Sequence, residues 1–458
     1  MITFACTDKQ AMGKLTRYKL GELLEVTRGA SLAGEFYAEE GELIRLTLGN
    51  FNMNGGGFKE NTSKTNIYFT GTVKDNFILK KDDIITPLTE QSKGLLGTTA
   101  RIPESGKYIQ SQDVALIRCN EDLLDNNFCY YLISSDIVRQ QISAAAQQTK
   151  IRHTSPDKIK DCIVWIPELE EQRRIGRILR DIDDKISLNR QINDNLEAMA
   201  KQLYVYWVVQ FDFPDENGKP YKSSGGKMVW NDKLKREIPE GWSCGTLLDI
   251  AIYTNGLACQ KFRPTNGNKL PVIKIKEMHD GISADTEYVK ADIPESVKVH
   301  DGDVLFSWSA SLEVMLWAMG NGGLNQHIFK VTSKNRYPRS FYFYQLIDYI
   351  GNFKRMAEAR KTTMGHITQD HLKQSTIALP PSTDLPNKLE EKLNPIFEAI
   401  IMNSQEIGAL TKQRDELLPL LTTGQITVNY HLYFLEWMSR MLVMIILYIC
   451  MSEEKSLL

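Results

Sequence analysis

The longest regular pattern of apolar positions in this chain has a heptad spacing. From residue 175, positions alternately four and three residues apart are mostly apolar, and they read Ile175, Leu179, Ile182, Ile186, Asn189, Asn193, Leu196, Ala200, Leu203 and Trp207. A seam of this period, kept over several heptads, is typical of a helix that packs along another helix. The pattern predicts a long helix over residues 169–210.

The same seam returns 214 residues later, as Leu389, Leu393, Ile396, Ile400, Asn403, Ile407, Leu410, Arg414, Leu417 and Leu421. It predicts a second long helix over residues 383–425. Neither helix can bury its stripe alone, so we expect the two to pack as an antiparallel coiled coil. The expected seam includes Ile182, Ile186, Asn189, Leu196, Ile396, Ile400, Asn403 and Leu410.

Two kinds of residue modify this expectation. Asn189 and Asn403 occupy the same layer of their seams, where a polar side chain lowers stability but fixes the register. Pro395 lies early in the second seam. Because proline lacks the N–H that continues a helix, it favours a kink or a late start there.

The segments before each seam have a different pattern. Short β-rich runs alternate with turn residues, as in 66–70, 114–117, 272–275 and 327–331. Helical stretches near 122–148 and 339–361 complete a mixed α/β segment in each half of the chain. The expected fold is therefore α+β, with two mixed α/β domains, each followed by a long helix.

An internal duplication links the two halves. The segment from Thr149 to Lys160 returns 213 residues later as Thr362 to Lys373, with Thr, His, Asp and Lys in register. A Pro-, Gly- and Ser-rich stretch separates the halves. The expected layout is a first domain 17–168, a helix 169–210, a linker 211–241, a second domain 242–382, a helix 383–425 and a tail 426–458 of unknown role.

Composition narrows the functional classes. The 458 residues carry a net charge of only −2, so any nucleic-acid contact must come from local basic faces rather than from overall charge. The seven cysteines form no C-x-x-C pair and no metal-ligand spacing, so no metal site is expected. The most apolar run, Met441 to Met451, is far shorter than the roughly 20 residues that cross a bilayer. We expect no membrane partner.

Catalytic motifs are missing from the sequence. It contains no G-x-x-x-x-G-K-[ST] loop for nucleotide phosphates and no Asn/Asp-Pro-Pro-aromatic motif. Gly55, Gly56 and Gly57 are interpreted as a flexible loop, and Asp183 and Lys185 as exposed helix charges. We therefore expect no catalytic residue and no cofactor in this chain.

The remaining polar residues suit the reading of DNA. Lys and Arg neutralise phosphates, while Gln, Asn, Thr, Arg and His can reach base edges. Candidates in the repeated motif and in the loops that differ between the copies are Asn52, Gln91, Lys93, Arg101, Gln148, Thr149, Lys150, Arg152, His153, Lys274, Lys276, Ser307, Ser309, Lys361, Thr362, Thr363 and His366. Solvated loops of a scaffold remain the alternative interpretation of each segment taken alone.

The layout resembles the DNA specificity subunits of type I restriction-modification systems over roughly residues 17–425. The resemblance is carried by the repeated Thr-x-x-x-His element leading to Ile166-Pro167 and Leu379-Pro380, by the helix opening at Leu169 and by the linker that ends at Trp242. The segment from Pro381 to Pro386 departs from the family pattern, because a Leu-Glu-Glu-Gln-like opening is usual there.

The resemblance implies a role without catalysis. Two target-recognition domains would each read half of a split, asymmetric site on double-stranded DNA, with the helix pair setting their separation. Two modification subunits that use S-adenosylmethionine, and restriction subunits driven by ATP with Mg²⁺, would be the partners, in the cytoplasm. The alternatives are a self-contained DNA methyltransferase or nuclease, and a coiled-coil interaction protein that never contacts DNA.

Overall fold

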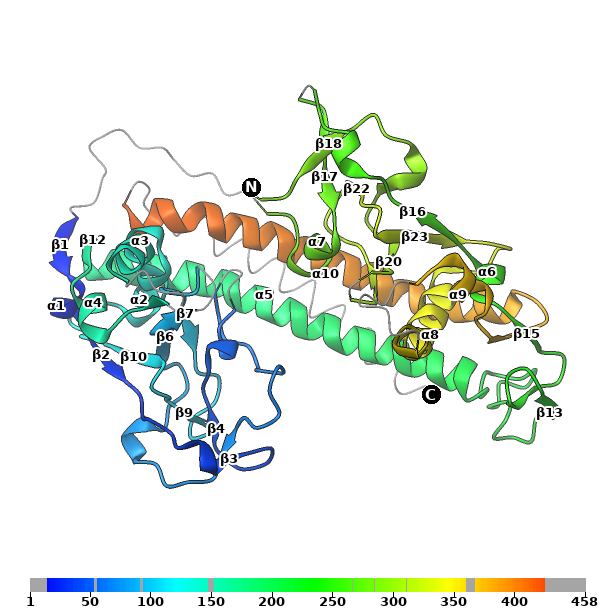
Figure 1. Ribbon diagram of the computed structural model, residues 1–458, viewed down its shortest axis with the longest axis horizontal. Helices are drawn as coiled ribbons and strands as arrows, with labels where there is room; N and C mark the ends of the chain where they lie inside the picture. Colours follow the sequence, from blue (N-terminus) through cyan, green and yellow to red (C-terminus); the bar gives the residue numbers. More distant parts are fainter. Residues whose placement is uncertain are drawn as a thin grey trace. The chain divides into compact units, whose positions relative to one another are not determined.

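The computed structural model of the chain describes residues 15–52, 56–90, 94–146, 152–265, 267–283, 285–309, 311–359 and 367–424. These residues form two compact units (Figure 1). Unit 1 contains residues up to Asp184 together with residues from Thr411 onward, and unit 2 contains Lys185–Leu410. The predicted tail 426–458 lies outside the described residues. No helix in the described part of the chain is long and apolar enough to cross a membrane.

Unit 1 begins with a mixed α/β domain. Its main sheet has the order β2-β10-β6-β8, and a smaller sheet has the order β3-β5-β4-β9. The strands are β1 (Thr16–Lys19), β2 (Leu24–Arg28), β3 (Tyr37–Ala38), β4 (Ile44–Arg45), β5 (Tyr68–Phe69), β6 (Ile84–Pro87), β7 (Thr89–Glu90), β8 (Ala100–Arg101), β9 (Tyr108–Ile109), β10 (Val114–Cys119), β11 (Arg152–His153) and β12 (Ile163–Ile166). The short helices are α1 (Leu20–Leu23), α2 (Asn126–Ser134), α3 (Asp136–Ala145) and α4 (Pro156–Lys160).

Unit 2 repeats the strand order of the main sheet. Its main sheet has the order β16-β23-β20-β21 and its second sheet the order β18-β17-β22-β19. The strands are β15 (Ser243–Gly245), β16 (Ala251–Asn255), β17 (Lys269–Ile273), β18 (Tyr288–Lys290), β19 (Lys298–Val299), β20 (Val304–Ser307), β21 (Glu313–Leu316), β22 (Gly322–Leu324), β23 (Ile328–Ser333) and β24 (Ile377–Leu379). The helices are α6 (Leu247–Ile250), α7 (Ile275–Asp280), α8 (Arg339–Ala359) and α9 (Gln369–Lys373).

Each domain is closed by its own first and last strands. β1 pairs antiparallel with β12, and β15 pairs antiparallel with β24. The chain therefore enters and leaves each domain at neighbouring positions, directly before a long helix begins. The predicted linker 211–241 contains a hairpin of β13 (Met228–Asn231) and β14 (Arg236–Pro239), which packs through Ile238 on Phe211 and Trp242.

The two long helices are α5 (Leu169–Tyr204), extended by a π-helical turn at Val205–Val209, and α10 (Asp384–Thr422). The seam residues Ile182, Ile186, Asn189 and Leu196 are buried. On α10, Ile400 is buried, whereas Ile396, Asn403 and Leu410 are partly buried. Phe397 and Ile401 are also buried on α10, so its apolar face is wider than the predicted seam.

Within unit 2 the helices run antiparallel, as predicted. Asn189 donates to Glu406 at 2.8 Å, and Asn193 donates to Ser404 at 3.1 Å. The side-chain amide of Asn403 donates to the side-chain oxygen Oδ1 of Asn193 at 2.9 Å. Asn189 and Asn403 therefore bond to different partners rather than to each other, although they occupy equivalent layers.

Three details differ from the sequence-based expectation. Of the two effects expected from Pro395, a kink or a late start, the late start is wrong, because α10 begins at Asp384 and continues through Pro395. One proline removes only one helical hydrogen bond. The helix expected near 122–148 is two helices, since Ser135 adopts an extended conformation with ψ 152°. Asp183 is not an exposed helix charge: within unit 1 it accepts from Tyr131 at 2.7 Å and from Arg414 at 2.9 Å.

Candidate nucleic-acid interface

The repeated motif forms a short strand followed by a one-turn helix. In unit 1, β11 pairs with β7, and the amide of Thr154 donates to the carbonyl of Leu88 at 2.8 Å. Ser155 then caps α4 by accepting from the amide of Lys158 at 3.3 Å. In unit 2 the corresponding helix α9 is capped by Thr368. His153 is exposed, so this candidate remains accessible to DNA.

Arg152 instead forms an ion pair and hydrogen bonds within the protein. Its guanidinium lies 2.7 Å from Glu90, whose side chain is 2% exposed, and donates to the hydroxyl of Ser143 at 2.9 Å. The other oxygen of Glu90 accepts from the backbone amides of Gly94, Leu95 and Leu96. Arg152 therefore balances a buried carboxylate that holds a loop, and its contact with DNA stays a prediction.

Arg101 also belongs to the scaffold. Its guanidinium carbon lies 4.5 Å from the centre of the Tyr130 ring, and its two terminal nitrogens are buried with no hydrogen-bond partner among the described residues. Burial raises the pKa of Tyr130 to about 12, so the ring presents a neutral face to the cation. A covered guanidinium cannot reach a DNA phosphate in this structure.

The candidates of unit 2 divide in the same way. Ser307 is fully buried and donates to the carbonyl of Ser311, and Ser309 is 7% exposed; both lie within the scaffold. Lys274 is partly exposed and pairs with Glu287 at 2.6 Å, an ion pair that lowers the pKa of Glu287. Lys276 is exposed on α7. Of these four, the two lysines remain accessible candidates.

Asn52 is partly exposed and its amide donates to the carbonyl of Gly57 at 3.0 Å. The other candidates of the repeated motif and its neighbouring loops lie outside the described residues. They are Gln91, Lys93, Gln148, Thr149, Lys150, Lys361, Thr362, Thr363 and His366.

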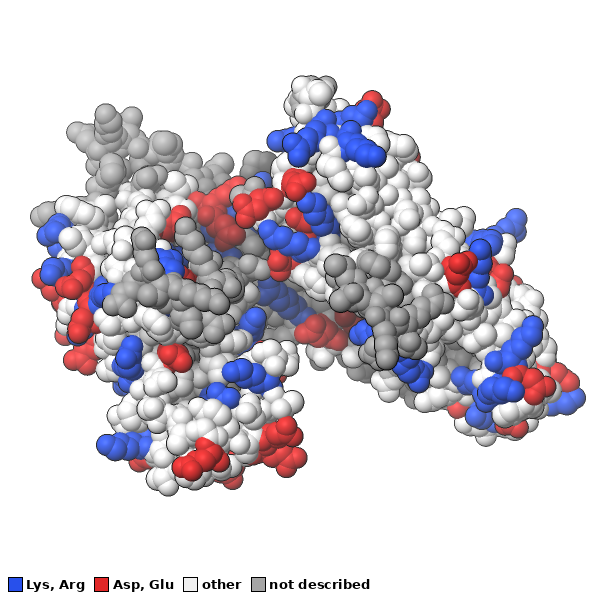
Figure 2. All heavy atoms as spheres, in the orientation of Figure 1, with Lys and Arg blue, Asp and Glu red and all other residues white. Residues whose placement is uncertain are grey.

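A basic surface outside the repeated motif covers the tip of unit 2. Figure 2 shows Lys and Arg side chains gathered there, where Figure 1 places β17 and β18. Lys261, Arg263 and Lys269 are exposed, and Tyr288 is exposed by 36%. The amine of Lys269 lies 4.2 Å from the centre of the Tyr288 ring. We call these four residues the basic tip. The sequence signal was the cluster of cations among Asn, Gly and Thr between 261 and 269.

The corresponding tip of unit 1 has a different surface. The segment 62–66, Thr-Ser-Lys-Thr-Asn, is exposed throughout, just before β5. The carbonyl of Asn66 accepts from Arg45, which in turn stacks on Tyr37 at 3.8 Å. Four neutral donors around one lysine offer base-edge hydrogen bonds rather than a dense positive charge. We call this segment the polar tip.

Comparisons with known proteins agree with the fold. The chain is 24% identical over 324 residues to the specificity subunit of type I restriction enzyme MjaIX from Methanocaldococcus jannaschii, covering 68% of this chain and 71% of that one. It is 24% identical over 375 residues to the HindI specificity subunit from Haemophilus influenzae, covering 70% of this chain and 81% of that one.

A solved structure shares the fold. The S subunit of a type I restriction-modification system from M. genitalium aligns with a TM-score of 0.57 at 15% identity, covering 92% of this chain and 99% of that one. The expected α+β architecture is thus confirmed. The family model of the type I restriction modification DNA specificity domain matches residues 12–198 and again 239–409. With both halves matched, the chain belongs to the type I restriction-modification specificity family, as its duplicated domains and paired helices indicated.

Proposed function

We propose that this specificity subunit binds a bipartite, asymmetric site on double-stranded DNA and performs no catalysis itself. The observation that supports this proposal most directly is that two domains with the same strand order in their main sheets present different tips. The polar tip of unit 1 is rich in neutral hydrogen-bonding side chains, whereas the basic tip of unit 2 is cationic. Equal scaffolds with unequal loops are suited to reading two different half-sites.

The partners follow from the same assignment. We propose that two modification subunits bind the complex and methylate DNA with S-adenosylmethionine, and that restriction subunits use ATP and Mg²⁺. This chain would then need no cofactor of its own. It would act where these partners act, in the cytoplasm.

The helix pair would set the distance between the half-sites. A heptad inserted at the Asn189 to Asn193 level of α5, with one inserted at the Asn403 to Glu406 level of α10, keeps the polar contacts in register. Seven residues add about 10 Å of helix, which corresponds to about three base pairs at 3.4 Å each.

The test maps methylated sites across a genome in cells that carry this chain and its modification partner. The wild-type chain should give one two-part site with a fixed spacer, and the double insertion should lengthen the spacer while leaving both half-sites unchanged. Changed half-site bases with an unchanged spacer would overturn the proposal. Methylation by the purified chain alone with S-adenosylmethionine would instead support the methyltransferase alternative.

A further inference from the structure

The two units share a turn beside the long helix. In unit 1 the amide of Lys80 donates to Asp83 at 2.8 Å, and in unit 2 the amide of His300 donates to Asp303 at 2.7 Å. The third residue of each turn has a positive φ, 66° at Asp82 and 87° at Gly302. Equal backbones thus carry an acid in one unit and a glycine in the other.

In unit 1 an arginine on the long helix holds this turn. Arg180 of α5 donates to Asp82 at 3.1 Å and to Asn127, the second residue of α2, at 3.0 Å. Its Nε also lies 3.6 Å from Asp184 on the same helix. The cation therefore sits on the helix, and its partners on the domain are Asp82 and Asn127.

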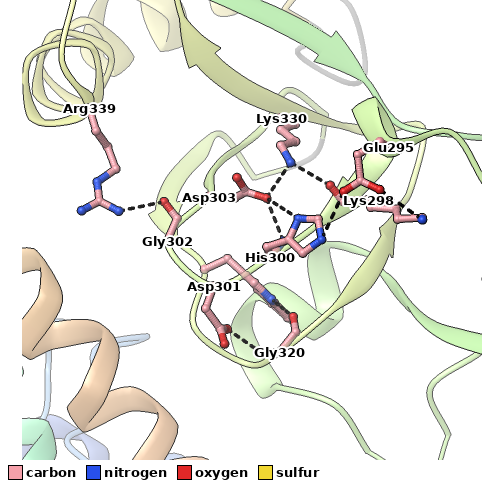
Figure 3. Close-up of polar contacts among 10 residues, drawn as sticks. Glu295, Lys298, His300, Asp301, Gly302, Asp303, Gly320, Lys330 and Arg339 are labelled. Carbon is pink, nitrogen blue, oxygen red and sulfur yellow. Dashed lines mark hydrogen bonds and ion pairs between the residues drawn. The ribbon is translucent and has the colours of Figure 1, made fainter.

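In unit 2 the arginine lies on the domain (Figure 3). Arg339, the first residue of α8, donates to the carbonyl of Gly302 at 3.3 Å. It also donates to Asn394 at 2.8 Å and to Glu398 at 2.9 Å, both on α10. A Cβ at position 302 would lie 2.8 Å from the Arg339 guanidinium, so the glycine makes room for it.

Three of the unit 2 residues have counterparts at equivalent positions of unit 1. At the helix offset of 214, Asn394 matches Arg180 and Glu398 matches Asp184. At the domain offset of 213, Arg339 matches Asn126, the first residue of α2. At these positions unit 1 has an arginine on the helix and an asparagine on the domain, and unit 2 has the reverse; the asparagine that Arg180 contacts is Asn127, the neighbour of Asn126.

The capping acid has exchanged sides as well. In unit 1, Asp125 of the domain accepts from the amide of Phe128 at 2.9 Å. Gly176 of α5 faces this turn, and a Cβ at position 176 would lie only 2.6 Å from the same amide nitrogen. In unit 2, Pro338 replaces Asp125, and Glu390 of α10, which matches Gly176, accepts from the amide of Ser340 at 2.9 Å. Either acid satisfies an amide at a helix N-terminus.

We infer that each recognition domain is matched to its own long helix by this exchanged set of contacts. The domain of unit 2 placed on α5 would bring Arg339 against Arg180 and leave α8 without its acid. The domain of unit 1 placed on α10 would bring Asp82 and Asp125 against Glu390 and Glu398 with no arginine among them. Like charges at hydrogen-bond distance oppose docking in both cases. The inference concerns the duplicated fold and does not depend on which DNA is bound.

The experiment moves the arginine of unit 1 from the long helix α5 to the domain, in the full chain. Arg180→Asn should lower the thermal unfolding midpoint of the full chain by about 2 to 4 °C, because Asp82 and Asp184 lose their cation. Adding Asn126→Arg and Asp82→Gly reproduces the unit 2 arrangement and should restore most of that loss. Asn126→Arg in the wild-type background should lower the midpoint, because two arginines then face each other.

Arg173→Asn is the matched control. Arg173 is exposed on the same helix, and its 3.6 Å ion pair with Glu170 joins two residues of that helix. This control should leave the midpoint unchanged. Additive losses in the combined variant, with no restoration, would overturn the inference. If the unit 1 variants fail to fold, Arg339→Asn alone and together with Asn394→Arg and Gly302→Asp test the reverse exchange in unit 2. Failure to recover there would equally refute it.

Discussion

Two buried tyrosines of the duplicated domains differ in how their hydroxyl groups are satisfied. Tyr131 donates to Asp183, which also pairs with Arg414. The hydroxyl of Tyr253 on β16 is buried without a hydrogen-bond partner among the described residues. A buried hydroxyl without a partner destabilises a fold, whereas one bonded to a carboxylate stabilises it.

Removing these hydroxyls should have opposite effects. We expect Tyr131→Phe to lower the free energy of unfolding by about 2 kcal/mol, because Asp183 loses a donor, and Tyr253→Phe to raise it by about 1 kcal/mol. Denaturant unfolding of the two variants and the wild type measures both changes. Equal destabilisation by both substitutions would contradict the assignment.

Stability should fall in alkaline solution. Burial raises the pKa of Tyr130 and of Tyr342 to about 12, from an ordinary value of 10. Below pH 10 both groups hold their protons in the folded and unfolded states. Between pH 10 and 12 the unfolded chain loses them first, so each group lowers stability by about 1.4 kcal/mol per pH unit. Denaturant midpoints between pH 9 and 11.5 test this, and Tyr342→Phe should flatten the slope.

Among the elements, the helix pair was the most predictable part of the fold. The heptad pattern of apolar residues is kept over a long stretch, and this pattern alone identified the residues of the seam. The partners across the seam could not be predicted, because they depend on the stagger of the two helices. The break between α2 and α3 escaped prediction for a related reason: the Ser135 hydroxyl bonds to the carbonyl of Leu132 at 2.7 Å, which competes with the helical ladder.

The polar layer of the helix pair should behave as a unit. Asn193→Leu leaves the amide of Asn403 without its acceptor, so we expect a loss of about 1 to 2 kcal/mol. Asn193→Leu with Asn403→Leu replaces both partners by apolar groups and should recover most of that loss. A double-mutant cycle in urea gives the coupling. Independent, additive losses would show that the layer does not couple the helices.

At the scale of the whole molecule, the net charge does not indicate which surfaces are basic enough to contact DNA. The basic tip is a local feature on a chain of net charge −2. Candidate DNA residues were predictable as residue types only. Arg152 and Lys276 are both basic, but Glu90 buries the first in an ion pair while α7 exposes the second. Tertiary partners decide such cases, and they do not appear in the local sequence.

The basic tip should account for part of the salt dependence of DNA binding. Replacing Lys261, Arg263 and Lys269 with Gln should reduce the slope of log affinity against log salt by up to about 3, since each phosphate contact contributes about 0.9. Lys219, Lys222 and Lys233, exposed in the linker, replaced together with Gln are the control. A control slope reduced as much as that of the tip variant would exclude a specific role for the tip.

The pairing of β1 with β12 and of β15 with β24 has a genetic consequence. A gene segment that encodes one closed domain carries both closing strands, so recombination at its borders preserves the sheet. A crossover between Ile166 and Arg180 separates the domain from its helix partner, whereas one beyond Asp184 keeps them together. Recombinant genes that survive selection should therefore carry their crossover inside the helix rather than at its first residue.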